Sequence, residues 1–348
     1  MGAMATLMDV ARLAGVSKAT VSLALNGKRV NETTRQHVLD CAKKLNYVPN
    51  RIGRTLSTGK SGTIQLLVIN SVKYINFFRE ISFFYHVLEG ILTSAENHQY
   101  SLHFDVKNWE DDALPAYFDT KARDRTIDGM LIIPQFIRNY SFMPVLEQRG
   151  LPYVILDPCI LDERVNSVKM DNYWGAKLVA ELFLANNFSN IAMINGPKNH
   201  YDASERERGF TETLLEQGVH VRKPAVFYGD FSMKSGFAGM ESILGSAKPE
   251  AVFCTNDYMA AGALRCLLSR GLRVPGDTAL VGYDNTDVAS TLYPQLTTVD
   301  NKMYELGKVL ADSLFGIMED AGRRAQTVLR PDLVIRETCP APAAGKND

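Results

Sequence analysis

The sequence predicts an α/β protein in which a small all-helical segment precedes a larger region of parallel β-sheets. Three observations support this fold class. Capped helical patterns fill residues 6–50, apolar runs of strand length alternate with helical segments afterwards, and 348 residues are enough for two or three domains. Hydrophobic residues make up 46% and charged residues 22%, which is typical of a soluble globular protein.

Three short helices are expected at the N-terminus. Thr6 and Asp9 form a capping-box-like pair before the first helix, and Gly15 permits the turn that ends it. Ser17 can cap a second helix and Asn31 a third. The positions predicted to pack inward are Val10, Ala11, Ala14, Val21, Ala24, Leu25, Val38, Cys41, Ala42 and Leu45. Two short helices joined by a tight glycine turn and backed by a third are typical of a helix-turn-helix.

Charge is distributed unevenly along the chain. Residues 1–60 hold ten Lys and Arg against three Asp and Glu, a net charge of +7. The remaining residues hold 28 basic and 36 acidic side chains, a net charge of −8. A basic head on an acidic body indicates a polyanionic partner, although charge alone also fits a solvated basic surface. Together with the helix-turn-helix pattern, it favours double-stranded DNA.

The body contains apolar strand-like runs separated by helical segments. These runs are "TIQLLVI", "GMLIIP", "YVILD", "IAMING", "AVFCTN" and "ALVGYD". Their alternation with helices predicts parallel sheets that are covered on both faces. Ligands of such sheets bind at the carboxyl ends of strands, and several runs end in polar residues: Asn195, Asn256, Asp257, Asp284 and Asn285. A flavodoxin-like enzyme would share this pattern, so the fold alone does not give the function.

The usual motifs of enzymes and cofactor sites are not found. The chain has no GxGxxG after a strand, no GxxxxGK[ST], no HExxH and no GxSxG. We therefore predict no catalytic residue, no metal ligand and no cofactor. The five cysteines show no paired zinc spacing, no apolar run reaches about 18 residues, and no signal-peptide layout is present. These observations predict a cytoplasmic protein with reduced thiols and no membrane partner.

The opening string "DVARLAGVSKATVSLALNG", followed by "YVPN", resembles the DNA-binding head of the lactose/galactose repressor (LacI/GalR) family. Further strings stand in family order along the body: "DGMLIIP", "LPYVILD", "VKMDNYWGA", "RERGF", "TNDYMAAGAL", "VPGDTALVGYDN" and "LTTVD". The resemblance covers residues 6–338. It implies the type I periplasmic-binding-protein-like fold, with two doubly wound parallel-sheet subdomains that are joined by three crossings and hold the effector between them.

This resemblance implies the following division of the chain. We expect a helix-turn-helix domain at 5–50, a hinge at 51–61, an effector-binding and dimerisation core at 62–338 and a tail at 339–348. Within the core, we expect an N-subdomain at 62–163 and 295–323 and a C-subdomain at 166–292 and 326–338. The tail region "RETCPAPAAGKND" lacks the leucine heptads of the family's tetramers, so a homodimer is expected.

The resemblance places base recognition at the start of the second helix, on Lys18 and Ala19. Lysine can donate to guanine O6 and N7, and alanine can contact a thymine methyl group. Leu23 stands where the family's "TVSR" has an arginine, so the usual operator sequence cannot be assumed at that base. The residues expected to contact DNA are Ser17, Lys18, Ala19, Thr20, Ser22, Leu23, Asn26, Tyr47, Asn50, Arg51, Arg54 and Leu56.

The segment after the head forms a hinge helix on a pseudo-palindromic operator in the family. Ile52 and Leu56 are spaced i,i+4, so in a dimer two leucines could enter the minor groove and kink the DNA. Gly53 stands where alanine is common and weakens the helix by about 1 kcal/mol. We therefore expect this hinge to depend on DNA and on dimer contacts, and to be a flexible linker away from DNA.

The resemblance carries five effector-binding residues onto this chain: Phe84, Arg206, Phe231, Asn256 and Asp284. The face of Phe231 suits a sugar ring or the plane of a base, and the fork of Arg206 suits ligand oxygens. Asp284 can accept hydrogen bonds from hydroxyl groups or an amine. Alternatives remain open: both phenylalanines could belong to the core, Asp284 could cap a loop, and Arg206 could pair with an adjacent glutamate.

The sequence therefore predicts a homodimeric, sequence-specific transcription regulator, expected to be a repressor, whose operator affinity a small effector controls by a population shift. A sugar or sugar derivative is the first choice of effector, and a nucleoside or purine is the second. A sugar-processing enzyme of flavodoxin-like fold remains an alternative, but it would not explain the head.

Overall fold

The structure is a computed structural model that describes residues 5–25, 30–47, 59–70, 82–108, 113–134, 140, 142–159, 162–219 and 226–342. Its contacts divide the chain into two compact units. The first consists of residues 1–63 with 124–128, and the second consists of residues 64–123 with 129–348. In the described residues, no helix is long and apolar enough to cross a lipid bilayer.

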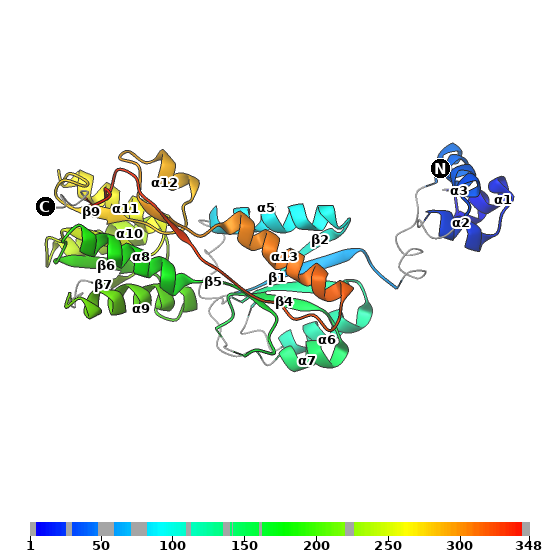
Figure 1. The fold of residues 1–348 in the computed structure, drawn as a ribbon, viewed down its shortest axis with the longest axis horizontal. Coiled ribbons are helices and arrows are strands. Elements are labelled where there is room, and N and C mark those ends of the chain that lie inside the picture. The colour runs from blue at the N-terminus through cyan, green and yellow to red at the C-terminus, as the bar shows by residue number, and fades with distance from the viewer. Residues whose placement is uncertain are drawn as a thin grey trace, which may run out of the picture. The chain divides into compact units, whose positions relative to one another are not determined.

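The first unit begins with α1 (Leu7–Ala14), α2 (Lys18–Leu25) and α3 (Glu32–Lys44) (Figure 1). The predicted capping box is present: the amide of Thr6 donates to Asp9 Oδ2 at 2.9 Å, and the amide of Asp9 donates to Thr6 Oγ1 at 3.4 Å. Gly15 ends α1 at φ +64°, a conformation that costs glycine little. The Oγ of Ser17 accepts from the amide of Thr20 at 3.1 Å and so caps α2.

A small apolar core joins these three helices. Val10, Val21 and Val38 are fully buried, and the small buried residues around them are Ala11, Ala14, Ala24, Cys41 and Ala42. Leu25 and Leu45 pack against this cluster from its margin. All the predicted inward positions therefore contribute to one core, because short side chains let the helices approach closely.

The second unit contains a six-stranded sheet in the order β11-β5-β4-β3-β1-β2. Its strands are β1 (Thr63–Asn70), β2 (Ser101–Asn108), β3 (Gly129–Pro134), β4 (Tyr153–Leu156), β5 (Ser167–Met170) and β11 (Gln326–Leu329). Strands β1, β3, β4, β5 and β11 pair in parallel. One face, which includes Ile64, Leu66 and Val68, packs against α5 (Ser82–Asn97) and α13 (Met303–Glu319). Helices α6 (Leu114–Asp124) and α7 (Met143–Arg149) lie on the opposite side (Figure 1).

The second unit also contains a four-stranded parallel sheet in the order β7-β6-β8-β9. Its strands are β6 (Ile191–Asn195), β7 (Val226–Tyr228), β8 (Ala251–Cys254) and β9 (Ala279–Val281). Ile191 and Met193 pack in the core that includes α8 (Asn172–Ala185) and α9 (Tyr201–Glu216). Ala192 and Ile194 pack in the core that includes α10 (Met233–Leu244) and α11 (Asp257–Ser269). Successive side chains of β6 thus bury opposite faces, which confirms the predicted parallel sheets with helices on both sides.

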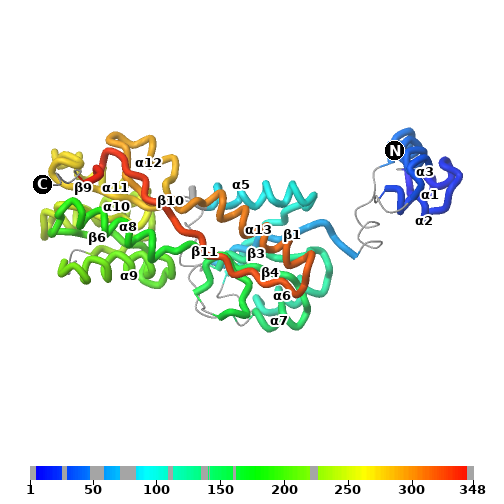
Figure 2. The backbone as a smooth tube through the Cα atoms, in the orientation of Figure 1, coloured from blue at the N-terminus to red at the C-terminus, as the bar shows by residue number. Residues whose placement is uncertain are grey.

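The chain passes between the two sheets three times. The first passage follows β5, and the second runs through α12 (Asp287–Thr291) and β10 (Thr298–Asp300) to α13. The third follows β11 through β12 (Asp332–Val334), which pairs with β10 antiparallel. Figure 2 shows this last passage as the red end of the tube, which runs from β11 to the second sheet.

Three of the predicted subdomain boundaries differ from the observed assignment of strands to sheets. Strands β5 and β11 belong to the six-stranded sheet, although boundaries at 166 and 326 would assign them to the second subdomain. Leu296 and Val299 pack in the cores of the four-stranded sheet, although 295–323 was expected in the first subdomain. Strand runs show where strands occur in the sequence, but only their pairing shows which sheet each strand joins.

Candidate nucleic-acid interface and effector site

Helix α2 presents the side chains that were predicted to read DNA. Ser17, Lys18 and Ala19 at its start are exposed, and the side chain of Leu23 is 39% exposed. Thr20 and Ser22 are half-buried. The opposite side of the same helix is buried in the head core. The helix therefore has one face for packing and one for a partner, as recognition through a major groove requires.

The remaining predicted DNA contacts fall into two groups. Tyr47 packs partly buried against the head core, and its amide donates to the carbonyl of Ala42 at 2.9 Å. The others lie outside the described residues, and they are Asn26, Asn50, Arg51, Arg54 and Leu56. The hinge prediction, which rests on Ile52, Gly53 and Leu56, lies outside them too.

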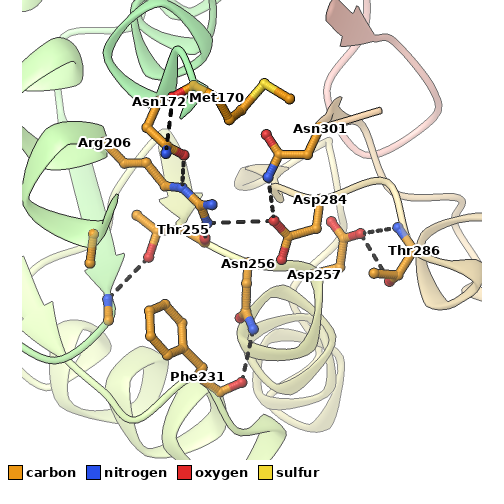
Figure 3. Close-up of polar contacts among 12 residues, drawn as sticks. Met170, Asn172, Arg206, Phe231, Thr255, Asn256, Asp257, Asp284, Thr286 and Asn301 are labelled. Carbon is orange, nitrogen blue, oxygen red and sulfur yellow. Dashed lines mark hydrogen bonds and ion pairs between the residues drawn. The ribbon is translucent and has the colours of Figure 1, made fainter. Parts of the chain in front are cut away.

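Arg206 of α9 lies at the centre of a buried polar cluster in the second unit (Figure 3). Its Nε donates to Asn172 Oδ1 at 2.8 Å, and its Nη1 donates to the carbonyl of Thr255 at 2.6 Å. Nη1 also lies 3.5 Å from Asp284 Oδ1. The guanidinium carbon lies 3.8 Å from the centre of the Tyr283 ring. Arg206 is thus a buried cation held by three segments. The alternative interpretation, in which Arg206 pairs with an adjacent glutamate on the surface, is wrong.

Asp284, just beyond β9, is the anionic partner of Arg206. Asn301 Nδ2 donates to Asp284 Oδ1 at 2.8 Å. Burial raises the pKa of Asp284 to about 6, although the charge of Arg206 and this hydrogen bond lower it. Asp257, fully buried behind it, accepts from the amide of Thr286 at 2.7 Å. Burial and the charge of Asp284 raise the pKa of Asp257 to about 7.

Phe231 lies before α10, where Asn256 holds its backbone. The Nδ2 of Asn256 donates to the carbonyl of Phe231 at 3.0 Å, while its Oδ1 accepts from the amide of Met259 at 2.9 Å and caps α11. The ring lies against Gly196, where any Cβ would collide with it, and 5.0 Å from the ring of His200 in an edge-on arrangement. Asn256 thus acts on the site by fixing the backbone of Phe231 and the start of α11.

Three residues of this region share an uncommon backbone conformation. Asp157 after β4, Phe231 and Asp284 have φ of 44°, 69° and 106°. Positive φ is uncommon for residues other than glycine and is found where a surrounding structure enforces it, often at functional sites. This conformation marks the strand and loop ends at which the polar side chains gather.

Phe84 is placed differently from the other four predicted effector residues. It packs against the aliphatic core of the six-stranded sheet, and its ring lies 5.5 Å from that of Phe104. The structure brings Arg206, Phe231, Asn256 and Asp284 together around the ends of β8 and β9, as predicted. Phe84 instead fits its alternative interpretation as a core residue.

Several residues of the cluster were missed in the sequence. Asn172 begins α8 and bonds Arg206, and Asn301 bonds Asp284. Asp157 accepts from the amide of Met170 at 2.7 Å, and burial and the charge of Asp202 raise its pKa well above the usual range. The missed residues around the cluster are Asp157, Asn172, His200, Asp202, Thr255 and Asn301. Asp157 could have been found, because it is the polar residue that ends the run "YVILD".

The described residues contain a polar hollow but no candidate metal site. Within those ranges no three His, Cys, Asp or Glu residues come close enough to hold a metal ion. A polar hollow of about 250 Å³ lies beside the cluster, along the α9 face that carries Ser204 and Glu207. Its side chains bond one another: the hydroxyl of Tyr228 donates to Glu207 at 2.7 Å, and Lys198 lies 4.5 Å from the Tyr228 ring.

A helix-turn-helix head followed by a two-sheet core with a polar cluster at strand ends defines a DNA-binding transcription regulator with a ligand-binding core. The chain belongs to the LacI family of bacterial regulatory proteins. Residues 6–50 match the profile "Bacterial regulatory proteins, lacI family", and residues 180–339 match a "Periplasmic binding protein-like domain". The predicted family and fold class are thereby confirmed.

Relatives and solved structures agree with this assignment. The HTH-type transcriptional regulator CelR of Thermobifida fusca is 33% identical over 339 residues, which are 96% of this chain and 98% of the relative. A structure described as a transcriptional regulator CelR–cellobiose complex is 30% identical, with a TM-score of 0.69 and coverage of 96% and 99%. A lac repressor dimer bound to operator and the anti-inducer ONPF is 26% identical, with a TM-score of 0.81 and coverage of 97% and 100%.

Proposed function

We propose that this protein is a homodimeric repressor that binds a pseudo-palindromic operator through its head and responds to a sugar bound at the Arg206–Asp284 cluster. The observation that carries the proposal is the pairing, in one chain, of an exposed recognition face on α2 with a buried, strained polar cluster in the core. We place the protein in the cytoplasm with the DNA it regulates. We assign it no catalytic role.

On the DNA side, the proposal assigns base contacts to Lys18 and Ala19, which are exposed at the start of α2. Ser17, Thr20 and Ser22 are short donors for phosphates, and Leu23 offers a methyl-sized apolar contact where an arginine is common. We propose Tyr47 as a contact to the DNA backbone. For the residues outside the described ranges, we propose Asn26, Asn50, Arg51 and Arg54 as further backbone contacts and Leu56 as the minor-groove wedge. The lac repressor structure, a dimer on operator, supports this geometry.

On the ligand side, the proposal assigns Phe231 to stacking and Arg206 and Asp284 to hydrogen bonding, with Asn256 as the residue that holds Phe231. The arrangement suits a sugar, which offers an apolar C–H face and a rim of hydroxyl groups. The CelR–cellobiose complex supports a carbohydrate. A base could stack on Phe231 equally well, so nucleosides are the alternative that the experiment must separate.

We further propose that the ligand acts by favouring one relative orientation of the two subdomains, with the passage between β5 and α8 and the passages at residues 285–302 and 330–335 as the connecting segments. The expected hinge at 51–61 would transmit this change to the head. The core boundaries would then follow the sheets, with β5 and β11 in the first subdomain and β10 with β12 between the two.

Two measurements test the proposal in sequence. Selection from random DNA by the purified protein should return a pseudo-palindromic site, and binding should weaken steeply with salt because phosphate contacts release counterions. Calorimetry with sugars and nucleosides should then find a ligand that changes the affinity for this site. Failure to enrich any DNA sequence, or equal DNA binding by residues 62–348 alone, would contradict the proposed function.

A further inference from the structure

The chain immediately before β1 is held by one side chain, that of Asp128. Asp128 directly precedes β3, the strand that pairs with β1 in parallel. Its Oδ1 accepts from the amide of Ser61 at 2.7 Å, and its Oδ2 accepts from the amide of Gly62 at 2.8 Å. Its own amide donates to the carbonyl of Thr63 at 2.8 Å. Three successive residues are thus bound to Asp128, and we call these three hydrogen bonds the Asp128 clamp.

The backbone at Gly62 is shaped for this contact. Gly62 has φ +66°, a conformation that other residues rarely adopt, and a Cβ there would meet no atom within 4 Å. Glycine is therefore favoured by the backbone conformation and not by the space around it. Successive amides in a turn of this kind form a concave site for an anion. Here the chain supplies the anion itself, and hydrogen bonds to a carboxylate are stronger than those between neutral groups.

The loop that carries Asp128 also contains a second carboxyl group with a different partner. Asp124 Oδ1 accepts from the amide of Thr126 at 3.0 Å and from the hydroxyl group of Thr126 at 2.8 Å. These bonds close a turn within the loop, and the side chain of Ile127 is buried beside it. Asp124 thus orders the loop, whereas Asp128 joins the loop to the chain that enters β1.

The clamp lies where the chain passes from exposed to buried residues. Residues 59–60 are exposed, residues 61–63 are half-buried, and residues 64–70 are buried. Ser61 is also the last residue of the expected hinge at 51–61. The clamp therefore fixes the residue at which the hinge leaves the core.

We propose that Asp128 is a positioning residue for operator binding: its carboxylate fixes the start of the hinge and thereby limits the half-site spacing that the two heads of a dimer can span. This inference rests on the proposed function, in which both heads bind one pseudo-palindromic site. Releasing residues 61 and 62 adds up to about 7 Å of chain to each connection. One base pair spans about 3.4 Å along the DNA axis. Loss of the clamp therefore gives each head additional reach of about two base pairs.

Limited digestion with trypsin tests the clamp without DNA. Lys60 is exposed, and cleavage after it gives a fragment that begins at Ser61. Asp128→Asn keeps the shape of the side chain but replaces one acceptor oxygen with a donor, so one of the two amides loses its partner. We expect this variant to be cleaved after Lys60 about tenfold faster than the wild type, because the clamped residues open more often.

Asp124→Asn is the matched control for this digest. It makes the same change of charge in the same loop, and its remaining oxygen can still accept from Thr126. We expect cleavage after Lys60 at the wild-type rate. Equal cleavage rates in Asp128→Asn and Asp124→Asn would overturn the proposal.

Operator titrations with the full chain test the positioning role. They use the DNA site that selection returns, and the same site with two base pairs inserted at its centre. Asp128→Asn should bind the original site about tenfold more weakly than the wild type, because two more residues must be ordered. The insertion should cost Asp128→Asn about tenfold less affinity than it costs the wild type or Asp124→Asn. A core that is merely less stable would lose affinity for both sites equally, so an unchanged insertion penalty would overturn the proposal.

Gly62→Ala tests the clamp from its other side. Alanine at φ +66° is strained although the space is free, so the amides of the clamp are displaced while the carboxylate stays. We expect faster cleavage after Lys60 and a smaller insertion penalty, as for Asp128→Asn. Wild-type behaviour of Gly62→Ala in both measurements would count against the clamp.

The two measurements separate this inference from the proposed function. A selection that returns no DNA site contradicts the proposed function, and the digest reports on the clamp independently of it. A selected site at which the wild type and Asp128→Asn show the same insertion penalty contradicts this inference and leaves the regulator intact.

Discussion

The guanidinium of Arg206 and the carboxylate of Asp284 form an ion pair, 3.5 Å between Nη1 and Oδ1, although 78 positions separate them in the chain. Both side chains are nearly inaccessible to water, with exposed fractions of 7% and 11%. The pair links the first half of α9 to the loop after β9. Removing one partner would leave the other charge buried and unpaired, and the same two side chains are proposed to bind the ligand.

Arg206→Ala should destabilise the core by about 3–5 kcal/mol, because it leaves the buried carboxylate of Asp284 without its charged partner. Arg208→Ala, two residues further along α9, removes an exposed arginine that pairs with Glu205 and should cost less than about 1 kcal/mol. Urea unfolding of both variants measures the difference. Adding Asp284→Asn to Arg206→Ala should recover part of the loss. Equal stability of the two single variants would show that the buried pair is not important for folding.

Lys18→Ala should weaken operator binding by about 1–3 kcal/mol, because Lys18 is exposed at the start of α2 and is proposed to contact a base. Lys43→Ala is the matched control, since Lys43 is exposed near the end of α3. Both variants should melt with the wild-type protein, because neither side chain is in the head core. Operator titrations check the prediction. A larger loss of operator affinity for Lys43→Ala than for Lys18→Ala would show that the base-contacting surface does not lie on α2.

Asp257→Asn should stabilise the protein at pH 8 and have a much smaller effect near pH 4. The pKa of Asp257 is raised to about 7 in the folded protein, so its protonated form is the favoured one there. The stability of the wild type relative to the variant should therefore fall by about 1.4 kcal/mol per pH unit from about pH 4 to pH 7, and level off above. Unfolding measured from pH 4.5 to 8.5 tests this.

Asp277→Asn is the control for that titration. Arg273 holds the pKa of Asp277 below its usual range, so this carboxyl stabilises the fold only above its unfolded pKa and loses that effect in acid. Its difference from the wild type should be flat between pH 5 and 8.5. A flat curve for Asp257→Asn as well would mean that Asp257 is ionised throughout.

Gly90→Ala should destabilise the six-stranded half of the core by about 1–3 kcal/mol. A Cβ at this position would collide with the carbonyl oxygen of Tyr304 and lie 2.7 Å from the amide nitrogen of Lys308, so α5 and α13 would have to separate. Gly245→Ala, at the end of α10, has nothing closer than 3.4 Å to its Cβ and should change stability by less than about 0.5 kcal/mol. Thermal melting of both variants decides whether the helix contact requires glycine.

The sequence by itself determined the features that depend on neighbours along the chain. The Thr6–Asp9 capping box, the turn at Gly15 and the inward positions of the head follow from local spacing, and the structure contains all of them. The apolar runs of the core determined where six of the twelve strands in the described residues lie, because a strand buried on both faces needs a continuous apolar run. Four of the five effector residues, carried over from the family resemblance, also meet in the structure.

Tertiary structure alone decided which distant segments meet. The membership of β5 and β11 in the first sheet depends on pairing across more than 150 residues, which no local pattern contains. Asn172 and Asn301 look like ordinary polar residues at the start of helices, and they join the cluster only because α8 and the second passage fold against Arg206 and Asp284. Phe84 differs: the family resemblance implied a ligand contact, but the neighbouring Phe104 and the aliphatic core bury much of its ring. Packing in three dimensions determines such contacts, because burial free energy depends on all the atoms that surround a side chain and not on its neighbours in sequence.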